Sequence, residues 1–181
     1  MYPIPTLERI RHRCEVHHRV RPCPAPTIPI MNRRTFFVTT ITWQRTPLFR
    51  SQERARLMLD VLAHYQEQKK YLLHEFVVMP DHLHLLLTPA SDVSIERAMQ
   101  LIKGGFSYRL GEKERGLAWQ ESFTSHHVQD EDDYERHAEY IRMNPVRAGL
   151  AARAEMYPYS SASAVDKAAR GRAALQSRVE E

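Results

Sequence analysis

The sequence has few cysteines and no long hydrophobic run, and both facts narrow the classes of protein that it can encode. Cys14 and Cys23 are its only cysteines. Two thiols make neither a disulfide framework nor a four-ligand zinc site, so we interpret them as free thiols. No apolar segment approaches the roughly 20 residues of a membrane helix, and no apolar signal segment follows the N-terminal arginines. We therefore expect a cytoplasmic protein with no membrane partner.

The body of the chain also lacks an excess of charge of either sign. The formal net charge is +4, but residues 1–30 hold five arginines against two glutamates, and residues 161–181 hold four basic against three acidic residues. Residues 31–160 are left with 17 basic and 17 acidic residues. Affinity of the body for nucleic acid must therefore come from local placement of basic groups, with the arm adding attraction that salt screens. An equally simple interpretation is that the basic ends aid solubility.

A chain of 181 residues that is 43% hydrophobic can bury one substantial core. Residues 1–30 mix Arg, His and Pro without a sustained period, which predicts a flexible arm. Residues 161–181 are rich in Ala, Ser and Arg and predict a flexible tail. We expect a single domain over residues 31–160.

Within that domain, the hydrophobic pattern predicts strands at 36–43, 71–79 and 82–87 and a short strand near 123–128. Ser51 and Ser94 are expected N-caps of helices that run to about Lys69 and Leu110. Pro80 and Asp81 predict a tight turn, so the second and third strands should form a hairpin. A last helix should begin within residues 130–133 and stop at Pro145.

This order of elements predicts an α+β, ferredoxin-like split βαβ antiparallel sheet with an added C-terminal helix. In such a sheet the first and third strands normally occupy the centre. The two crossover helices cover one face, and the other face is left for a functional site.

The third expected strand carries two histidines inside an apolar run, MPDHLHLLL. A strand sends residues i and i+2 to the same face, so His82 and His84 should stand side by side while Leu83, Leu85 and Leu87 enter the core. A lone strand histidine is more often structural than a ligand, but a pair can supply two corners of a metal site. A third ligand would have to come from another element.

The last helix offers such a ligand in HAEYIRMNPVRAGL, residues 137–150. Helical spacing puts His137, Tyr140, Ile141 and Asn144 on one stripe. If this stripe faces the histidines, Asn144 can present an amide oxygen to a metal ion, and Tyr140 can present its phenol to the metal-bound substrate. Taken alone, the tyrosine could equally be a core residue and the asparagine a polar helix end.

Together these segments resemble the single-tyrosine HUH transposases, specifically the REP-associated tyrosine transposase branch. The resemblance runs from about Arg34 to Ser161. Its markers are the histidine hairpin, the helix with Met99, Lys103 and Tyr108, the Trp119–Gln120 pair before Phe123, YIRMNPVRAGL and a late Tyr-Ser-Ser. Two mild departures are Asp81, where asparagine is frequent, and the long arm before Met31. Neither removes an atom that the chemistry needs.

The resemblance implies a metal-dependent enzyme that nicks and joins single-stranded DNA at hairpin-forming palindromic repeats, in bacterial cytoplasm near the nucleoid. His82, His84 and Asn144 would bind Mg²⁺ or Mn²⁺, and Tyr140 would be the nucleophile that forms a 5′-phosphotyrosine. The phenol must lose a proton. The sequence does not decide which neighbour helps among His126, His127, His137, Arg142 and Arg147. It also leaves open whether the protein acts as a monomer or a homodimer.

Basic and aromatic side chains around these motifs are candidate DNA contacts. Cations could meet phosphates and rings could stack on bases, although each residue could instead be ordinary core or solvated surface. The candidates are Lys103, Tyr108, Arg109, Trp119, Phe123, Arg142, Arg147 and Arg153.

Other functions compete with the transposase interpretation. Histidine-triad hydrolases need a third alternating histidine, and 2H phosphoesterases need His-x-Thr/Ser, but position 86 is Leu. Both classes are therefore excluded. The remaining rival is a non-catalytic binder of structured DNA or RNA on the same fold. All four proposed site residues are present, which argues against a decayed enzyme.

Overall fold

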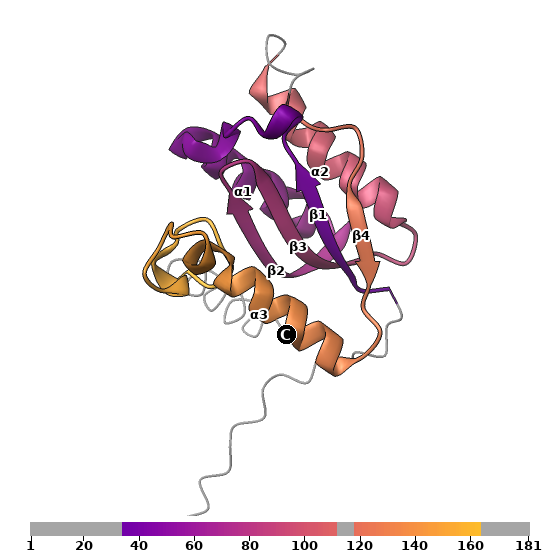
Figure 1. Cartoon of the computed structure of the whole chain (residues 1–181). Coiled ribbons are helices and arrows are strands. Elements are labelled where there is room, and N and C mark those ends of the chain that lie inside the picture. Colours follow the sequence, from indigo (N-terminus) through magenta and orange to yellow (C-terminus); the bar gives the residue numbers. More distant parts are fainter. Residues whose placement is uncertain (1–33, 112–117, 164–181) are drawn as a thin grey trace, which may run out of the picture.

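The computed structural model describes residues 34–111 and 118–163. The expected arm, residues 1–30, lies outside these ranges, as does most of the expected tail. Within them, the chain forms one antiparallel sheet with helices on both faces (Figure 1). No helix in the described ranges is long and apolar enough to cross a membrane.

The sheet has the strand order β2-β3-β1-β4. Its strands are β1 (Phe36–Ile41), β2 (Tyr71–Met79), β3 (His82–Pro89) and β4 (Thr124–His127). All three neighbouring pairs are antiparallel. The predicted hairpin between β2 and β3 and the central position of β1 and β3 are confirmed, so the histidine strand lies in the middle of the sheet.

Two helices cover one face of the sheet, as predicted. They are α1 (Gln52–Glu67) and α2 (Ile95–Leu110). Ser51 and Ser94 cap them by accepting hydrogen bonds from the backbone N–H groups of Arg54 and Arg97, which satisfies donors that the first turn of a helix leaves unpaired. The main core lies between these helices and the sheet. Its largest fully buried side chains include Phe106, Met58, Leu62, Leu83, Leu85 and Leu87.

The third helix, α3 (Glu131–Arg147), packs against the opposite face. Asp130 caps it and three acidic residues occupy its first turn, where the helix dipole favours negative charge. A second, smaller apolar cluster joins this helix to the sheet and includes Val77, Leu86, Ala138, Ile141 and Tyr157. The predicted fold class is therefore correct, and the added helix covers the face that a plain split βαβ sheet leaves open.

The prediction that Pro145 ends this helix is wrong, because the helix continues to Arg147. A proline in a last turn removes only one backbone donor. The turn still closes, since the N–H groups of Ala148 and Leu150 bond to the carbonyls of Asn144 and Pro145. Gly149, with φ of 68°, supplies the left-handed residue that commonly terminates a helix.

After α3 the chain returns to the free edge of β2. The N–H of Val78 donates to the carbonyl of Tyr159, and the N–H of Ser161 donates to the carbonyl of Phe76. The hydroxyl of Tyr157 reaches the carbonyl of Val78 at 2.8 Å. The expected domain boundary at residue 160 falls within this segment, which stays buried as far as Ser163.

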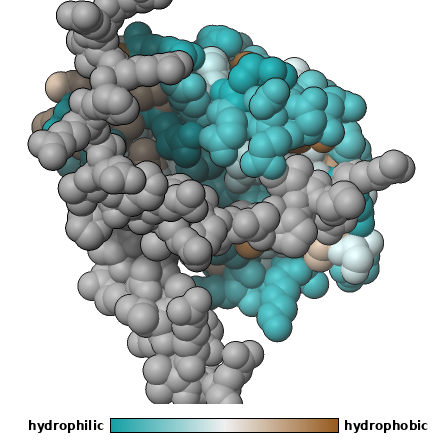
Figure 2. All heavy atoms as spheres, turned by 90° about the horizontal axis from the view of Figure 1, so that it is seen from below, coloured by the Kyte–Doolittle hydropathy of each residue, from teal (hydrophilic) through white to brown (hydrophobic). Residues whose placement is uncertain are grey.

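The described residues on the underside of the molecule form a largely polar surface. Figure 2 shows the underside of the molecule, where most described residues are hydrophilic and apolar ones form only small areas. Burial of the apolar side chains in two clusters on either side of the sheet accounts for this.

Two adjacent glycines in α2 give a test of the packing between α1 and α2. A Cβ at Gly105 would lie 2.7 Å from the Tyr65 ring, whereas one at Gly104 would meet nothing within 4 Å. Gly104→Ala should stabilise the protein by about 0.5–1 kcal/mol through helix propensity. Gly105→Ala should lose that gain because Tyr65 must move. In urea denaturation, the free energy of unfolding of Gly105→Ala should be at least about 1 kcal/mol lower than that of Gly104→Ala. Equal values would contradict the close approach of Gly105 to Tyr65.

Candidate active site

The two histidines of β3 lie together on the α3 side of the sheet. Their ring centroids are 4.8 Å apart, while Leu83, Leu85 and Leu87 point into the core beneath α1 and α2. This confirms the predicted alternation. His84 is only 5% exposed and the His82 side chain is 20% exposed, so both rings are largely buried.

A hydrogen bond fixes the Nδ1 atom of each ring. His82 Nδ1 is 2.6 Å from Oδ1 of Asp81, and His84 Nδ1 is 2.8 Å from Oγ1 of Thr39. Each ring is left with Nε2 as the atom that can bind a ligand, and such supporting bonds orient metal-binding histidines in proteins. The sequence interpretation missed Thr39. The signal that could have found it is the register of β1 against β3, where these two residues are direct partners.

Burial, and secondarily the neighbouring His82, lowers the pKa of His84 from 6.5 to about 3. The ring is therefore neutral at physiological pH and keeps a lone pair. Burial alone would raise the pKa of Asp81, but its hydrogen bond and charge interaction with His82, together with Arg45, lower it below the usual value. The strand thus offers a neutral His84 imidazole beside a His82 ring that contacts a carboxylate.

Tyr140 lies beside this pair in the same chain. Its ring centroid is 5.2 Å from that of His84, and the guanidinium carbon of Arg147 lies 5.5 Å from the Tyr140 ring. Phe37 of β1 stacks on His84 and meets the Tyr140 ring edge-on. Tyr140 remains 38% exposed, so α3 brings a reachable phenol next to the histidines without a second subunit.

Asn144 follows Tyr140 by one helical turn and is half-buried. Its backbone carbonyl accepts from Ala148. Among the ring and hydrogen-bond contacts of the described residues, its side chain is not joined to either histidine. The structure therefore brings three of the four predicted residues together and sets the fourth on the adjoining turn of the same helix.

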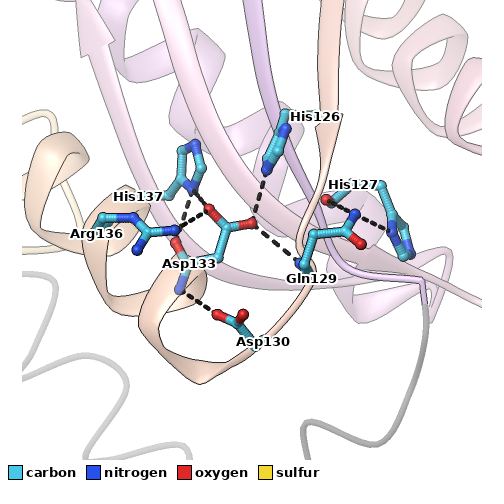
Figure 3. A network of polar contacts seen from close by, with 7 residues as sticks. All are labelled: His126, His127, Gln129, Asp130, Asp133, Arg136 and His137. Atoms are coloured by element: carbon cyan, nitrogen blue, oxygen red, sulfur yellow. Dashed lines mark hydrogen bonds and ion pairs between the residues drawn. The ribbon is translucent and has the colours of Figure 1, made fainter.

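A second polar network, which the sequence interpretation missed as a unit, fastens the N-terminal end of α3 to β4 (Figure 3). The Asp133 carboxylate is 2.7 Å from Nε2 of His126 and accepts from the N–H of Gln129 and from Arg136. His137 Nδ1 lies 2.8 Å from the Asp133 carbonyl oxygen. Asp133 is buried, with a side chain only 7% exposed.

The electrostatics of this network favour a charged Asp133. Burial would raise the pKa of its carboxyl, but the bonds from His126, Gln129 and Arg136 lower it far below the usual range. The ligand atoms of His126, Asp133 and His137 lie within 4.8 Å of one another, so these groups could also hold a cation. Arg136 already supplies positive charge to the same carboxylate. We therefore interpret this network as a structural connection between β4 and α3.

The predicted DNA contacts divide into two groups. Lys103 bonds to the carbonyls of Gln120 and Glu121, Trp119 packs on Phe49 and Phe106, and Phe123 packs against the main core. Arg142 pairs with Glu75 and Glu135. The side chains of these residues are used in contacts within the fold. The other candidates are more exposed, although Arg147 also contacts the Tyr140 ring; they are Tyr108, Arg109, Arg147 and Arg153.

Burial of a neutral His84 predicts a specific pH dependence for the ion-free protein. Its pKa is lower in the folded than in the unfolded chain, so the unfolded chain binds more protons between pH 6.5 and about 3. Stability should therefore fall as pH falls through this window, by at most about 1.4 kcal/mol per pH unit from this group. In EDTA, His84→Gln should flatten the slope of unfolding free energy against pH, and His64→Gln on α1 should not. An unchanged slope in His84→Gln would contradict this account.

The Asp133 network predicts a large difference between two neighbouring aspartates. Asp133→Asn removes the charge that His126, Gln129 and Arg136 contact, and should destabilise the protein by about 2–4 kcal/mol. Asp132→Asn changes an exposed acid in the same helical turn and should cost less than about 0.5 kcal/mol. Guanidinium denaturation of both variants measures the difference, and similar values would show that the network contributes little.

Comparison with known proteins identifies the family of this chain. The family described as "Transposase IS200 like" matches residues 32–144. A REP-associated tyrosine transposase of Escherichia coli (strain K12) is 26% identical over 127 residues, which cover 70% of this chain and 74% of the relative. A putative REP-associated tyrosine transposase of Haemophilus influenzae is 31% identical over 97 residues, covering 46% and 54%.

Solved structures agree as well. The structure described as a REP-associated tyrosine transposase bound to a REP hairpin superposes with a TM-score of 0.64 at 25% identity, over 77% of this chain and 81% of that chain. The family match over residues 32–144 includes His82, His84, Tyr140 and Asn144. The chain therefore belongs to the IS200-like transposase family of tyrosine transposases, as the resemblance of its motifs predicted.

Proposed function

We propose that this protein nicks single-stranded DNA in a metal-dependent reaction and transfers the strand through a 5′-phosphotyrosine, acting on hairpin-forming palindromic repeats in the bacterial cytoplasm. The observation that carries the proposal is the position of Tyr140, whose exposed phenol ring lies 5.2 Å from the buried His84 ring of the same chain. A nucleophile next to a potential metal site is the arrangement that this chemistry requires.

The donor set fits a divalent ion. His82 and His84 can each offer Nε2, because Asp81 and Thr39 hold their Nδ1 atoms, and Asn144 can add an amide oxygen from the helical turn after Tyr140. Two nitrogens and one neutral oxygen leave positions for phosphate oxygens and water, which suits Mg²⁺ or Mn²⁺. When bound there, the ion would supply Lewis-acid polarisation of a phosphate oxygen.

The residues of this chain would carry the covalent step. The Tyr140 oxygen attacks phosphorus and forms a P–O bond, while the bond from phosphorus to the 3′ oxygen of the preceding nucleotide breaks. The phenol proton leaves to solvent or a nearby base, and the departing 3′ oxygen takes up a proton. Because the phosphoryl bond is stored on Tyr140, a second 3′-OH can reverse the step without ATP.

Arg147 supports a role of this surface in DNA binding. Its guanidinium lies beside the Tyr140 ring and is exposed, so it can meet a phosphate held at the phenol. The hairpin substrate follows from the relative whose structure contains a REP hairpin. Since Tyr140 reaches His84 within one chain, a monomer has the parts for the reaction, and a homodimer is not needed to complete the site.

The rival proposal is a non-catalytic binder of structured DNA or RNA on the same fold. Such a binder would need neither an accessible phenol nor two oriented imidazoles beside it. The oriented rings of His82 and His84 therefore favour the enzyme.

A covalent adduct tests the function directly. A labelled single-stranded hairpin incubated with the protein and Mn²⁺ should become attached to it and migrate with it on a denaturing gel. Tyr140→Phe should abolish the adduct because it removes the attacking oxygen. EDTA should abolish it because the phosphate loses its Lewis acid, and His84→Ala should lower it by at least about 100-fold.

Tyr65→Phe provides the matched control, since Tyr65 is a tyrosine on α1 that is partly buried against the main core, on the face of the sheet opposite Tyr140, and it should form the adduct normally. A wild-type protein that shifts the hairpin on a native gel but never becomes attached would identify a binder and overturn the proposal.

A further inference from the structure

The turn that follows β1 displays three consecutive exposed side chains, Trp43, Gln44 and Arg45. Trp43 is 42% exposed and the Arg45 side chain is 61% exposed. Exposed tryptophan is uncommon on surfaces that bind nothing, because its large ring is normally buried. Neither residue is needed to fill the two cores.

The backbone of this turn is in an unusual conformation. Gln44 and Arg45 have φ angles of 50° and 54°, and neither is glycine, asparagine or aspartate. Left-handed conformations at such residues carry strain that the surrounding structure must overcome, and they gather at ligand-binding positions.

Several hydrogen bonds hold the strained turn in place. The Thr42 hydroxyl lies 2.7 Å from the Thr46 carbonyl, and the Thr46 hydroxyl donates to the Trp43 carbonyl at 2.8 Å. The N–H of Trp43 donates to the carbonyl of Ala118 at 3.2 Å. The turn is therefore fixed from both sides, which keeps its side chains positioned without a ligand.

The turn adjoins the candidate active site. Ile41 pairs with His82 in the sheet, and the N–H of Thr42 donates to the Asp81 carbonyl. Phe37 and Thr39 contact His84 from the site face of β1. Because Thr42 is still extended, strand alternation carries Trp43 toward this same face, just beyond His82.

Arg45 links the turn to the histidines electrostatically. Its guanidinium is 3.3 Å from one oxygen of Asp81, and the other oxygen of that carboxylate contacts Nδ1 of His82. Five N–H donors on a guanidinium exceed what one carboxylate contact uses. Arg45 can therefore bind an anion while it stays beside Asp81.

We propose that Trp43 and Arg45 form a subsite for an unpaired nucleotide next to the phosphate that Tyr140 attacks. Trp43 stacks on the base, Arg45 contacts the adjoining phosphate, and Gln44 lies where it can reach the edge of the base. The occupant is an unpaired base because both faces of a base within a stem are covered by its neighbours, whereas a tryptophan needs one open face. This subsite rests on the function proposed above and adds a part of the substrate to it.

Binding measurements on the full chain separate the subsite from the chemistry. Tyr140→Phe protein is titrated with three labelled hairpins that share one stem: one with a single-stranded 5′ extension, one with a 3′ extension and one with none. Trp43→Ala in this background should weaken binding of one extended hairpin by about 10- to 100-fold. Binding of the bare stem should change less than about threefold, and Trp43→Phe should retain most of the affinity.

Leu72→Ala is the matched control. Leu72 is a half-exposed apolar residue on β2 that pairs with Thr88, at the far end of the sheet from His82, so this variant should bind all three hairpins like the parent. Tryptophan fluorescence gives a second reading in the unaltered chain. The extended hairpin should quench it more than the bare stem does, because Trp43 is exposed and Trp119 is partly buried against the main core.

The subsite and the strand-transfer reaction are overturned by different experimental outcomes. Equal affinity of Trp43→Ala and its parent for both extended hairpins would overturn the subsite, as would equal affinity of the parent for the extended hairpins and the bare stem. Absence of the Tyr140 adduct would overturn strand transfer and leave the binding difference unaffected.

Discussion

The packing of α3 across the second face of the sheet is the interaction on which the site depends. Ile141 is fully buried against the cluster that contains Val77 and Leu86. Neighbouring residues of a helix point about 100° apart, so burying Ile141 turns Tyr140 to the rim of the contact. That rim lies over His84. The hydrophobic packing of Ile141 thus determines the position of the Tyr140 phenol.

Both ends of α3 are fastened by interactions of a different kind. At its start, the buried Asp133 carboxylate joins the helix to His126 of β4 (Figure 3). Beyond its end, Tyr157 and Ser161 bond to the backbone of β2. Apolar packing alone is nondirectional and would allow the helix to slide. Directional bonds at two separated points remove that freedom, and catalytic groups must be held to within a fraction of an ångström.

The histidine strand shows how one segment can serve two cores and a site. Leu83, Leu85 and Leu87 fill the core beneath α1 and α2, while Leu86 joins the cluster under α3. The second half of the strand is therefore buried on both sides and reads as a continuous apolar run. His82 and His84 occupy the part of the same face that the apolar cluster under α3 leaves to Tyr140, which explains why the two histidines precede Leu86 in the strand.

Local features of the fold were predictable from the sequence, and long-range ones were not. The limits of β2 and the caps at Ser51 and Ser94 depend on neighbouring residues, and the structure has them as predicted. The Thr39–His84 bond joins residues 45 positions apart and depends on a strand register that no local pattern specifies. The internal bonds of Lys103 depend equally on how a distant loop packs. Pro145 was misjudged because its effect depends on whether a later residue, Gly149, can complete the turn.

Asp81 shows how closely the fold and the chemistry are joined. Its carbonyl accepts from the N–H of Thr42, whose hydroxyl oxygen also lies 2.8 Å away, and this contact ties the hairpin between β2 and β3 to the end of β1. Its carboxylate accepts from Nδ1 of His82 and so makes Nε2 of that ring a better electron donor. The cation of Arg45 on the second carboxylate oxygen draws charge away and moderates this effect. An anion bound to Arg45 would weaken this moderating effect, so occupation of the turn at Trp43–Arg45 would change the electron density at Nε2 of His82.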